Sequence, residues 1–205
     1  MEKPNSAIYL PKLKSLVYKS MGDTTWNCPN LEILKFDEAG SRYKCSFESS
    51  LDKLEQFSFY DCKVGYKEAF QILNNAPNLK KLVAPQMPDT VNLPLLQELE
   101  TSYRKKIDWN KFQSLKILNL SKYNLIKFTI LIFVSVTLDG MEIALPNLQK
   151  CTISAYSPIQ FIFNTPSLLE LDLSEVIEVK EILCNSKCAL ELFILSKISL
   201  FLILI

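Results

Sequence analysis

The chain of 205 residues is 48% hydrophobic and 22% charged, with a formal net charge of +1. This composition is typical of a folded protein and is too apolar for a disordered one. Clustered Lys and Arg drive binding to nucleic acid, so the near-neutral charge indicates that nucleic acid is not a partner. The one notable basic run, residues 104–106, is interpreted as a solvated loop.

The sequence lacks the residues on which several classes of chemistry depend. It contains no histidine, and its four glycines are isolated from one another. The lack of histidine excludes Ser-His-Asp and Cys-His catalysis and any histidine-ligated metal site. Isolated glycines leave no loop of the kind that cradles phosphate groups. We therefore expect a protein that is not an enzyme and holds neither a cofactor nor a metal.

The start of the chain and its cysteines indicate a cytoplasmic protein. Residues 1–14 contain no apolar segment of about seven or more residues, which a secretory signal needs. The six cysteines are scattered, so reduced thiols are expected. Cys184 and Cys188, with Cys151, could suggest a thiolate metal site, but structural zinc sites usually show two short-spaced pairs. We interpret these cysteines as small buried residues, with Cys151 in a position that belongs to a repeat leucine.

A short phrase recurs along nearly the whole chain: a proline, then an L-x-x-L core that starts two residues later. Six copies contain the proline, and their first leucines are Leu13, Leu31, Leu79, Leu96, Leu148 and Leu168. Three further copies lack it and start at Leu54, Leu115 and Leu190. Eight of the nine copies have an apolar residue at the first, fourth and sixth positions, a spacing typical of leucine-rich repeats. We expect a short strand in each of the nine repeats.

Between these strands the sequence predicts different connecting segments. Helix-forming residues at 66–74 predict a short helix, which Asn74, Asn75 and Pro77 end before a strand at 79–84. The longest interval, between Leu115 and Leu148, contains residues 125–130 with the same L-x-x-F-x-I shape. These residues form either a degenerate extra turn or a strand-like insertion.

The last residues, 189–205, begin as a ninth repeat and end in an apolar run. A membrane-spanning helix needs about 20 apolar residues, and this run contains Glu191 and Lys197. We favour a buried or truncated last strand over a membrane tail, so a membrane partner is not expected.

The spacing of the apolar residues also predicts how the repeats stack. In a strand, residues at alternate positions point to the same side, so the leucines point inward and the residues between them point outward. One repeat cannot bury its own leucines, and neighbouring repeats bury them together. The predicted fold class is α/β: a single domain, residues 1–205, forming a leucine-rich repeat solenoid with about nine irregular repeats. A parallel β-sheet is expected on the concave face, with short helices or loops on the convex side.

The outward residues of that sheet are the candidate binding residues for a protein partner. They are Lys35, Ser58, Lys81, Glu98, Glu100, Asn119, Thr152, Glu170 and Asp172, with Tyr60 as an aromatic anchor after the third strand. Two carboxylate pairs, Glu98 with Glu100 and Glu170 with Asp172, leave open a hydrolase with two catalytic carboxylates. We favour an exposed polar sheet surface.

The repeated C/A/L-P-N-L-x-x-L phrase, from Leu10 to about residue 195, resembles the leucine-rich repeat regions of F-box proteins. It also looks like the repeats of plant disease-resistance receptors. The resemblance to F-box proteins implies that the concave face or rim recognises a substrate for ubiquitination. We expect a protein-interaction module, with no F-box segment before Leu10. The alternatives are a repeat protein held at a membrane by residues 189–205 and, third, the hydrolase.

Overall fold

The computed structural model describes residues 7–19, 23–37, 45–59, 66–85, 91–102, 107–121, 138–155, 159–176, 179–184, 190–195 and 203–204. The chain divides into two compact units, residues 1–96 and 97–205. Each unit is a stack of β-solenoid turns, and we describe the two in sequence order. The expectation of a single domain stays a prediction.

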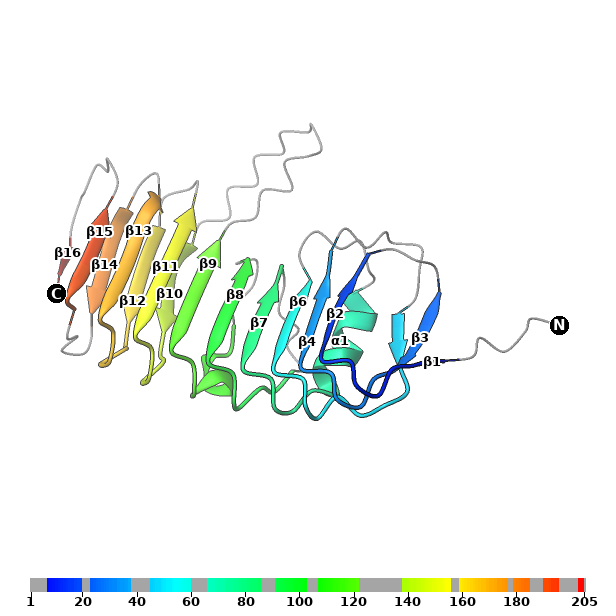
Figure 1. Ribbon diagram of the computed structural model, residues 1–205. Helices are drawn as coiled ribbons and strands as arrows, with labels where there is room; N and C mark the ends of the chain where they lie inside the picture. Colours follow the sequence, from blue (N-terminus) through cyan, green and yellow to red (C-terminus); the bar gives the residue numbers. More distant parts are fainter. Residues whose placement is uncertain are drawn as a thin grey trace, which may run out of the picture. The chain divides into compact units, whose positions relative to one another are not determined.

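Unit 1 contains one strand for each of its first four repeats. The strands are β2 (Ser15–Tyr18), β4 (Ile33–Phe36), β6 (Gln56–Phe59) and β7 (Lys81–Ala84), all parallel and neighbours in this order (Figure 1). We call them the first sheet of unit 1. Each strand begins two residues after the first leucine of its repeat, so the register places Leu34 beside Phe57, and Phe57 beside Leu82. The predicted strands and their parallel pairing are confirmed here.

The return segments of unit 1 differ from the expected helices or loops. Two of them are strands, β3 (Thr24–Asn27) and β5 (Cys45–Phe47), which form a second parallel sheet with β1 (Ile8–Tyr9). Threonine and aromatic residues favour a strand wherever a neighbouring turn supplies hydrogen-bond partners. The predicted helix is present as α1 (Tyr66–Asn74), which connects β6 to β7 and buries Ala69, Ile72 and Leu73.

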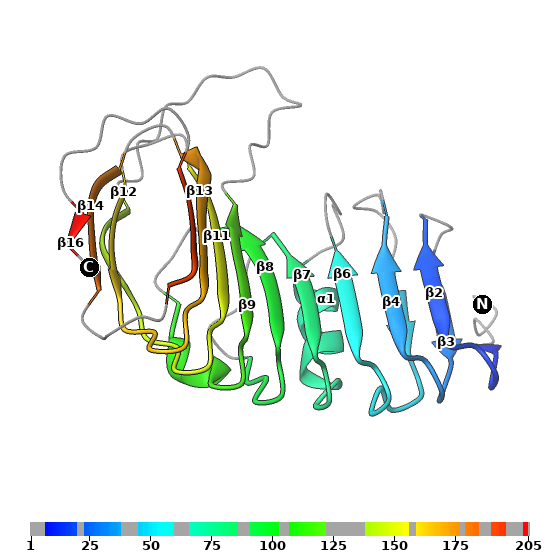
Figure 2. The same cartoon turned by 60° about the vertical axis from the view of Figure 1, so that its left-hand side comes forward.

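Unit 2 repeats this plan with two parallel sheets. Its first sheet contains β8 (Glu98–Ser102), β9 (Ile117–Ser121), β11 (Lys150–Ala155), β13 (Glu170–Val176) and β15 (Leu192–Leu195). Its second sheet contains β10 (Leu138–Ile143), β12 (Ile159–Phe163), β14 (Val179–Cys184) and β16 (Ile203–Leu204). Figure 2 shows β12 and β14 facing β11 and β13. A 3-10 helix, Trp109–Phe112, lies between β8 and β9 in the chain.

The strands on either side of the longest interval between repeats are neighbours in the first sheet. Strands β9 and β11 pair directly, with Leu118 beside Cys151. The interval contributes the return strand β10, and residues 125–130 lie outside the described residues.

The core lies inside the turns and follows the predicted inward positions. Leu34, Leu82 and Leu118 are completely buried, and Leu171 is 2% exposed. Burying a leucine side chain contributes about 1.5–3 kcal/mol, so the inward rows supply most of the cohesion between turns. Aromatic rings reinforce unit 1, where the centroids of Phe36 and Phe57 lie 5.5 Å apart in an edge-to-face contact.

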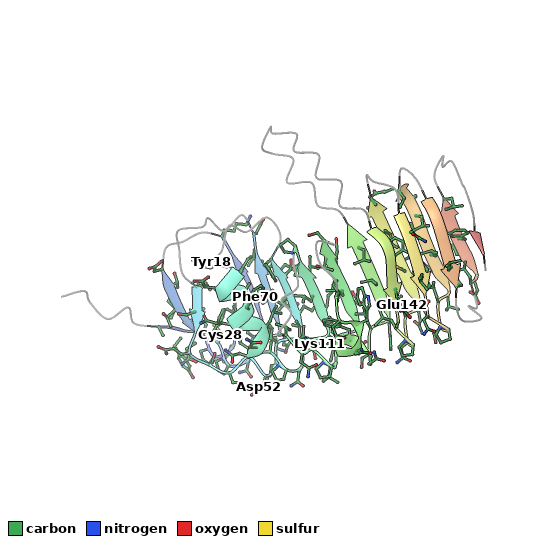
Figure 3. All side chains as sticks on the ribbon, turned by 180° about the vertical axis from the view of Figure 1, so that it is seen from behind. Tyr18, Cys28, Asp52, Phe70, Lys111 and Glu142 are labelled. Carbon is green, nitrogen blue, oxygen red and sulfur yellow. The ribbon has the colours of Figure 1, made fainter. Side chains whose placement is uncertain are left out.

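The recurring proline has a defined place in the turn that precedes each first-sheet strand. The N–H of the first leucine donates to the carbonyl oxygen three residues earlier, as in Leu31 to Cys28 at 3.1 Å and Leu148 to Leu145 at 3.2 Å. This is the hydrogen bond of a β-turn, in which proline is favoured at the second position because its φ angle is already suitable. The residue that opens the turn is a further inward position, and Cys28 there is completely buried (Figure 3).

Candidate interaction surface

The side chains of the first-sheet strands alternate between buried and exposed. In β11, Lys150 is exposed, Cys151 is buried, Thr152 is half-buried and Ile153 is buried. In each unit, we call the surface formed by the first-sheet side chains that point away from the core the outward face. It contains the candidate binding residues of the described strands, as the sequence pattern predicts, while Tyr60 lies outside the described residues.

In unit 1 the register aligns the outward side chains in two rows. The rows are Ser15, Ile33, Gln56 and Lys81, and then Val17, Lys35, Ser58 and Val83. Lys35 and Lys81 are exposed, Ser58 is half-buried and Val83 is only 9% exposed. The charged residues among these eight are both lysines, so this part of the outward face is positive.

In unit 2 the register again gives two rows. They are Glu98, Ile117, Lys150, Glu170 and Leu192, and then Glu100, Asn119, Thr152, Asp172 and Ile194. All six candidate residues of unit 2 are therefore brought onto one face. The apolar members of these rows, Ile117, Leu192 and Ile194, are 38%, 45% and 38% exposed. Their alternation with buried residues was the signal that could have identified them.

Contacts with β11 and within β13 hold the carboxylates of β13 in place. Lys150 Nζ lies 2.7 Å from Glu170 Oε2, and this hydrogen bond, followed by the carboxylate charge, raises the pKa of Lys150. Ser154 Oγ lies 2.6 Å from Glu175 Oε2, and the Ser174 N–H donates to Asp172 Oδ1 at 2.9 Å. In the described first-sheet strands of unit 2, the exposed or half-buried charged side chains are Glu98, Glu100, Lys150, Glu170, Asp172 and Glu175. The outward face of unit 2 is therefore acidic.

The two carboxylate pairs lie on strands that are not neighbours. Glu98 and Glu100 are on β8, whereas Glu170 and Asp172 are on β13, and β9 and β11 lie between them. With strands about 4.8 Å apart, the pairs are separated by about 14 Å. Hydrolases with two catalytic carboxylates hold them at most about 9.5 Å apart, so the two pairs do not combine into one such site.

The cysteines considered as metal ligands lie on different sheets. Cys151 is completely buried on β11, where the register places it between Leu118 and Leu171, and burial raises the pKa of its thiol. It therefore packs as a small apolar residue. Cys184 is half-buried at the end of β14, and Cys188 lies outside the described residues. In the part of the chain that is described, no group of three His, Cys, Asp or Glu side chains could hold a metal ion.

Two parts of the apolar C-terminal run are strands of the solenoid. Residues 192–195 form β15, which pairs with β13, and Ile203 and Leu204 of β16 pair with Ile182 and Leu183 of β14. Among the described residues, no helix is both long and apolar enough to cross a membrane. The basic run at residues 104–106 lies outside the described residues.

No family model, no curated protein and no solved structure matches this chain.

Proposed function

We propose that the protein is a non-enzymatic protein-interaction module of leucine-rich repeat type, which binds a protein partner on the outward face. The observation that carries the proposal is a parallel sheet whose outward side chains are largely exposed or half-buried. Parallel sheets usually have both faces covered. Here large apolar side chains such as Val17, Leu192 and Ile194 are 51%, 45% and 38% exposed. A partner that covers this face would remove them from water.

The composition of the outward face also fits a protein partner. Apolar side chains stand among hydroxyl, amide and charged groups, a mixture typical of non-obligate protein interfaces. The hydrogen-bonded strands hold these side chains at fixed spacings, which lowers the entropic cost of binding. The leucine-rich repeat type is supported by the buried first, fourth and sixth residues of the second to eighth repeats, such as Leu79, Leu82 and Ala84.

The resemblance to F-box proteins adds a narrower proposal, that the bound partner is a substrate for ubiquitination in the cytoplasm. Its test is a ubiquitination assay in a cell extract with and without added full-length chain. A partner that binds the outward face but gains no ubiquitin when the chain is added rejects only this narrower proposal. The membrane alternative is less favoured, because β15 and β16 are paired strands rather than a separate tail.

The test is a selection of displayed random peptides on the immobilised full chain. Thr152→Trp places a large ring in the middle of the outward face, between Asn119 and Asp172, without entering the core. Thr152→Trp should weaken the selected peptides by about tenfold or more, since it blocks contact. The control is Glu142→Lys on β10 of the second sheet, where the labelled side chain is exposed (Figure 3), and it should leave binding unchanged.

Circular dichroism melting curves show whether both variants remain folded. If folded Thr152→Trp retains the selected peptides as well as the unmodified chain does, the outward face is not the binding surface.

A further inference from the structure

We propose that the outward face of unit 2 binds an extended peptide segment with the pattern basic-x-apolar-x-basic-x-apolar, which crosses the strands from β8 to β15. This inference rests on the proposed function and names the chemistry of the partner. Three features of unit 2 carry it: the charge of its outward face, the spacing of its acidic strands and its exposed apolar side chains.

Charge selects a basic partner. Carboxylates occur on two strands, Glu98 and Glu100 on β8 and Glu170, Asp172 and Glu175 on β13. Among the described outward residues of unit 2, Lys150 on β11 is the one ammonium group, and it is paired with Glu170 at 2.7 Å. A face with this excess of negative charge attracts a basic segment and repels an acidic one.

The spacing of the acidic strands selects an extended segment with a defined repeat. Strands β8 and β13 are three interstrand spacings apart, about 14 Å. An extended peptide advances about 3.3 Å per residue, and alternate side chains point to the same side. Two basic side chains four residues apart therefore span about 13 Å and face the same way, so each can reach one acidic strand.

The exposed apolar side chains provide the remaining two contacts. Leu192 and Ile194 on β15 pair in register with Glu170 and Asp172, one strand beyond the second acidic strand. The side chain two residues after the second basic residue lies about 20 Å along the peptide from the first basic residue. Strand β15 lies about 19 Å from β8, so this side chain reaches Leu192 and Ile194. The side chain between the two basic residues lies over Ile117, which is 38% exposed on β9. Exposed ion pairs alone contribute little, so these apolar contacts supply affinity and the charges supply selectivity.

The experiment uses fluorescently labelled synthetic peptides and the full chain, with affinity measured by fluorescence anisotropy. The probe is Lys-Ser-Val-Ser-Lys-Ser-Leu, and the control has the same composition in the order Lys-Lys-Ser-Val-Ser-Ser-Leu. The probe should bind at least about tenfold more tightly than the control, because only the probe can reach both acidic strands. Its affinity should fall as salt is raised from about 0.05 M to about 0.5 M, because salt screens exposed charges.

Charge reversal on the protein provides the matched test. The double variant Glu98→Lys with Asp172→Lys should weaken the probe by about tenfold or more and should bind the corresponding peptide with glutamates in place of lysines. Glu142→Lys makes the same kind of change on the second sheet and should have no effect. Equal binding of the probe and the reordered peptide, or unchanged binding to the folded double variant, overturns the inference.

This inference and the proposed function can fail separately. If displayed peptides depend on Thr152 but carry no basic pattern, the outward face is a binding surface and the inference about its partner is wrong. If no selected peptide is weakened by Thr152→Trp, both are wrong.

Discussion

The side-chain Nδ2 of Asn78 donates a hydrogen bond to the backbone carbonyl oxygen of Asp52, one turn earlier in the solenoid, at 2.8 Å. The same contact recurs in two other turns. Asn30 donates to the Pro11 carbonyl at 2.6 Å, and Asn147 donates to the Gln113 carbonyl at 2.8 Å. Each asparagine directly precedes the first leucine of a repeat, and each acceptor lies two residues before the first leucine of the preceding repeat. The Pro-Asn-Leu phrase thus combines a turn with a link to the neighbouring turn.

Removing one of these links should destabilise unit 1. We expect Asn78→Ala to lower the free energy of unfolding by about 1 kcal/mol, because the carbonyl oxygen of Asp52 loses its donor. Urea unfolding followed by circular dichroism measures the change. The control is Asn92→Ala, since Asn92 is exposed and forms no side-chain hydrogen bond among the described residues. Equal losses for the two variants would contradict a stabilising role for the asparagine contact.

The recurring proline occupies the second position of a β-turn. Placing a proline there in two repeats that lack it should change the free energy of unfolding in opposite directions. Asp52 and Gln113 occupy this position in repeats without the proline, where Leu54 bonds to Leu51 and Leu115 to Phe112. Asp52→Pro should raise the free energy of unfolding by about 0.4–1 kcal/mol by restricting the unfolded chain. Gln113→Pro should lower it, because Phe112 ends a 3-10 helix and a residue before proline avoids helical angles.

Urea unfolding of the two proline variants side by side measures these changes. If both variants change the free energy in the same direction, the turn argument is wrong.

The buried rows of the first sheet should be far more sensitive to truncation than exposed positions. Leu82 is completely buried, and the register places it beside Phe57. Leu82→Ala should cost about 2–5 kcal/mol, because it removes apolar contacts and leaves a cavity. Leu95→Ala is the matched control, since Leu95 is 46% exposed, and it should cost no more than about 0.5 kcal/mol. Thermal and urea unfolding of both variants provide the comparison.

A buried thiol should make stability depend on alkaline pH. Burial raises the pKa of Cys45 in the folded chain from 9.0 to about 12. Between these two values the unfolded chain loses the thiol proton while the folded chain keeps it, so folding becomes less favourable as pH rises. The contribution of Cys45 is fully present below pH 9.0 and declines by up to about 1.4 kcal/mol per pH unit above it.

The measurement compares the original chain with Cys45→Ala at several pH values from 8 to about 11. Other groups titrate in both chains and cancel in the difference, so only the original chain should lose the extra stability above about pH 9. A difference in unfolding free energy that stays constant with pH would show that this thiol ionises equally in both states. Cys45 should also resist iodoacetamide in the folded chain at pH 8 and react after unfolding, because the thiolate is the reactive form.

The sequence by itself determined the rungs of the first sheet. A strand in each repeat, stacked on the strand of the next, buries the apolar residues at the first, fourth and sixth positions together. The strands after Leu31, Leu79 and Leu115 lie where this spacing predicts them. The helix at 66–74 was also encoded locally, because its apolar residues share one side and Pro77 follows it. These features depend on residues that are close in the chain.

Only the tertiary structure decided the second sheets and which outward side chains are neighbours across the strands. Whether a return segment such as Thr24–Asn27 or Ile159–Phe163 forms a strand depends on the neighbouring turn, which supplies its hydrogen-bond partners. The layout of charge depends on register in the same way, since Asp172 and Ile194 become neighbours only when β13 and β15 pair. Pairing between residues far apart in the sequence leaves no periodic signal within either segment, and that is why the second sheets could not be predicted from the sequence.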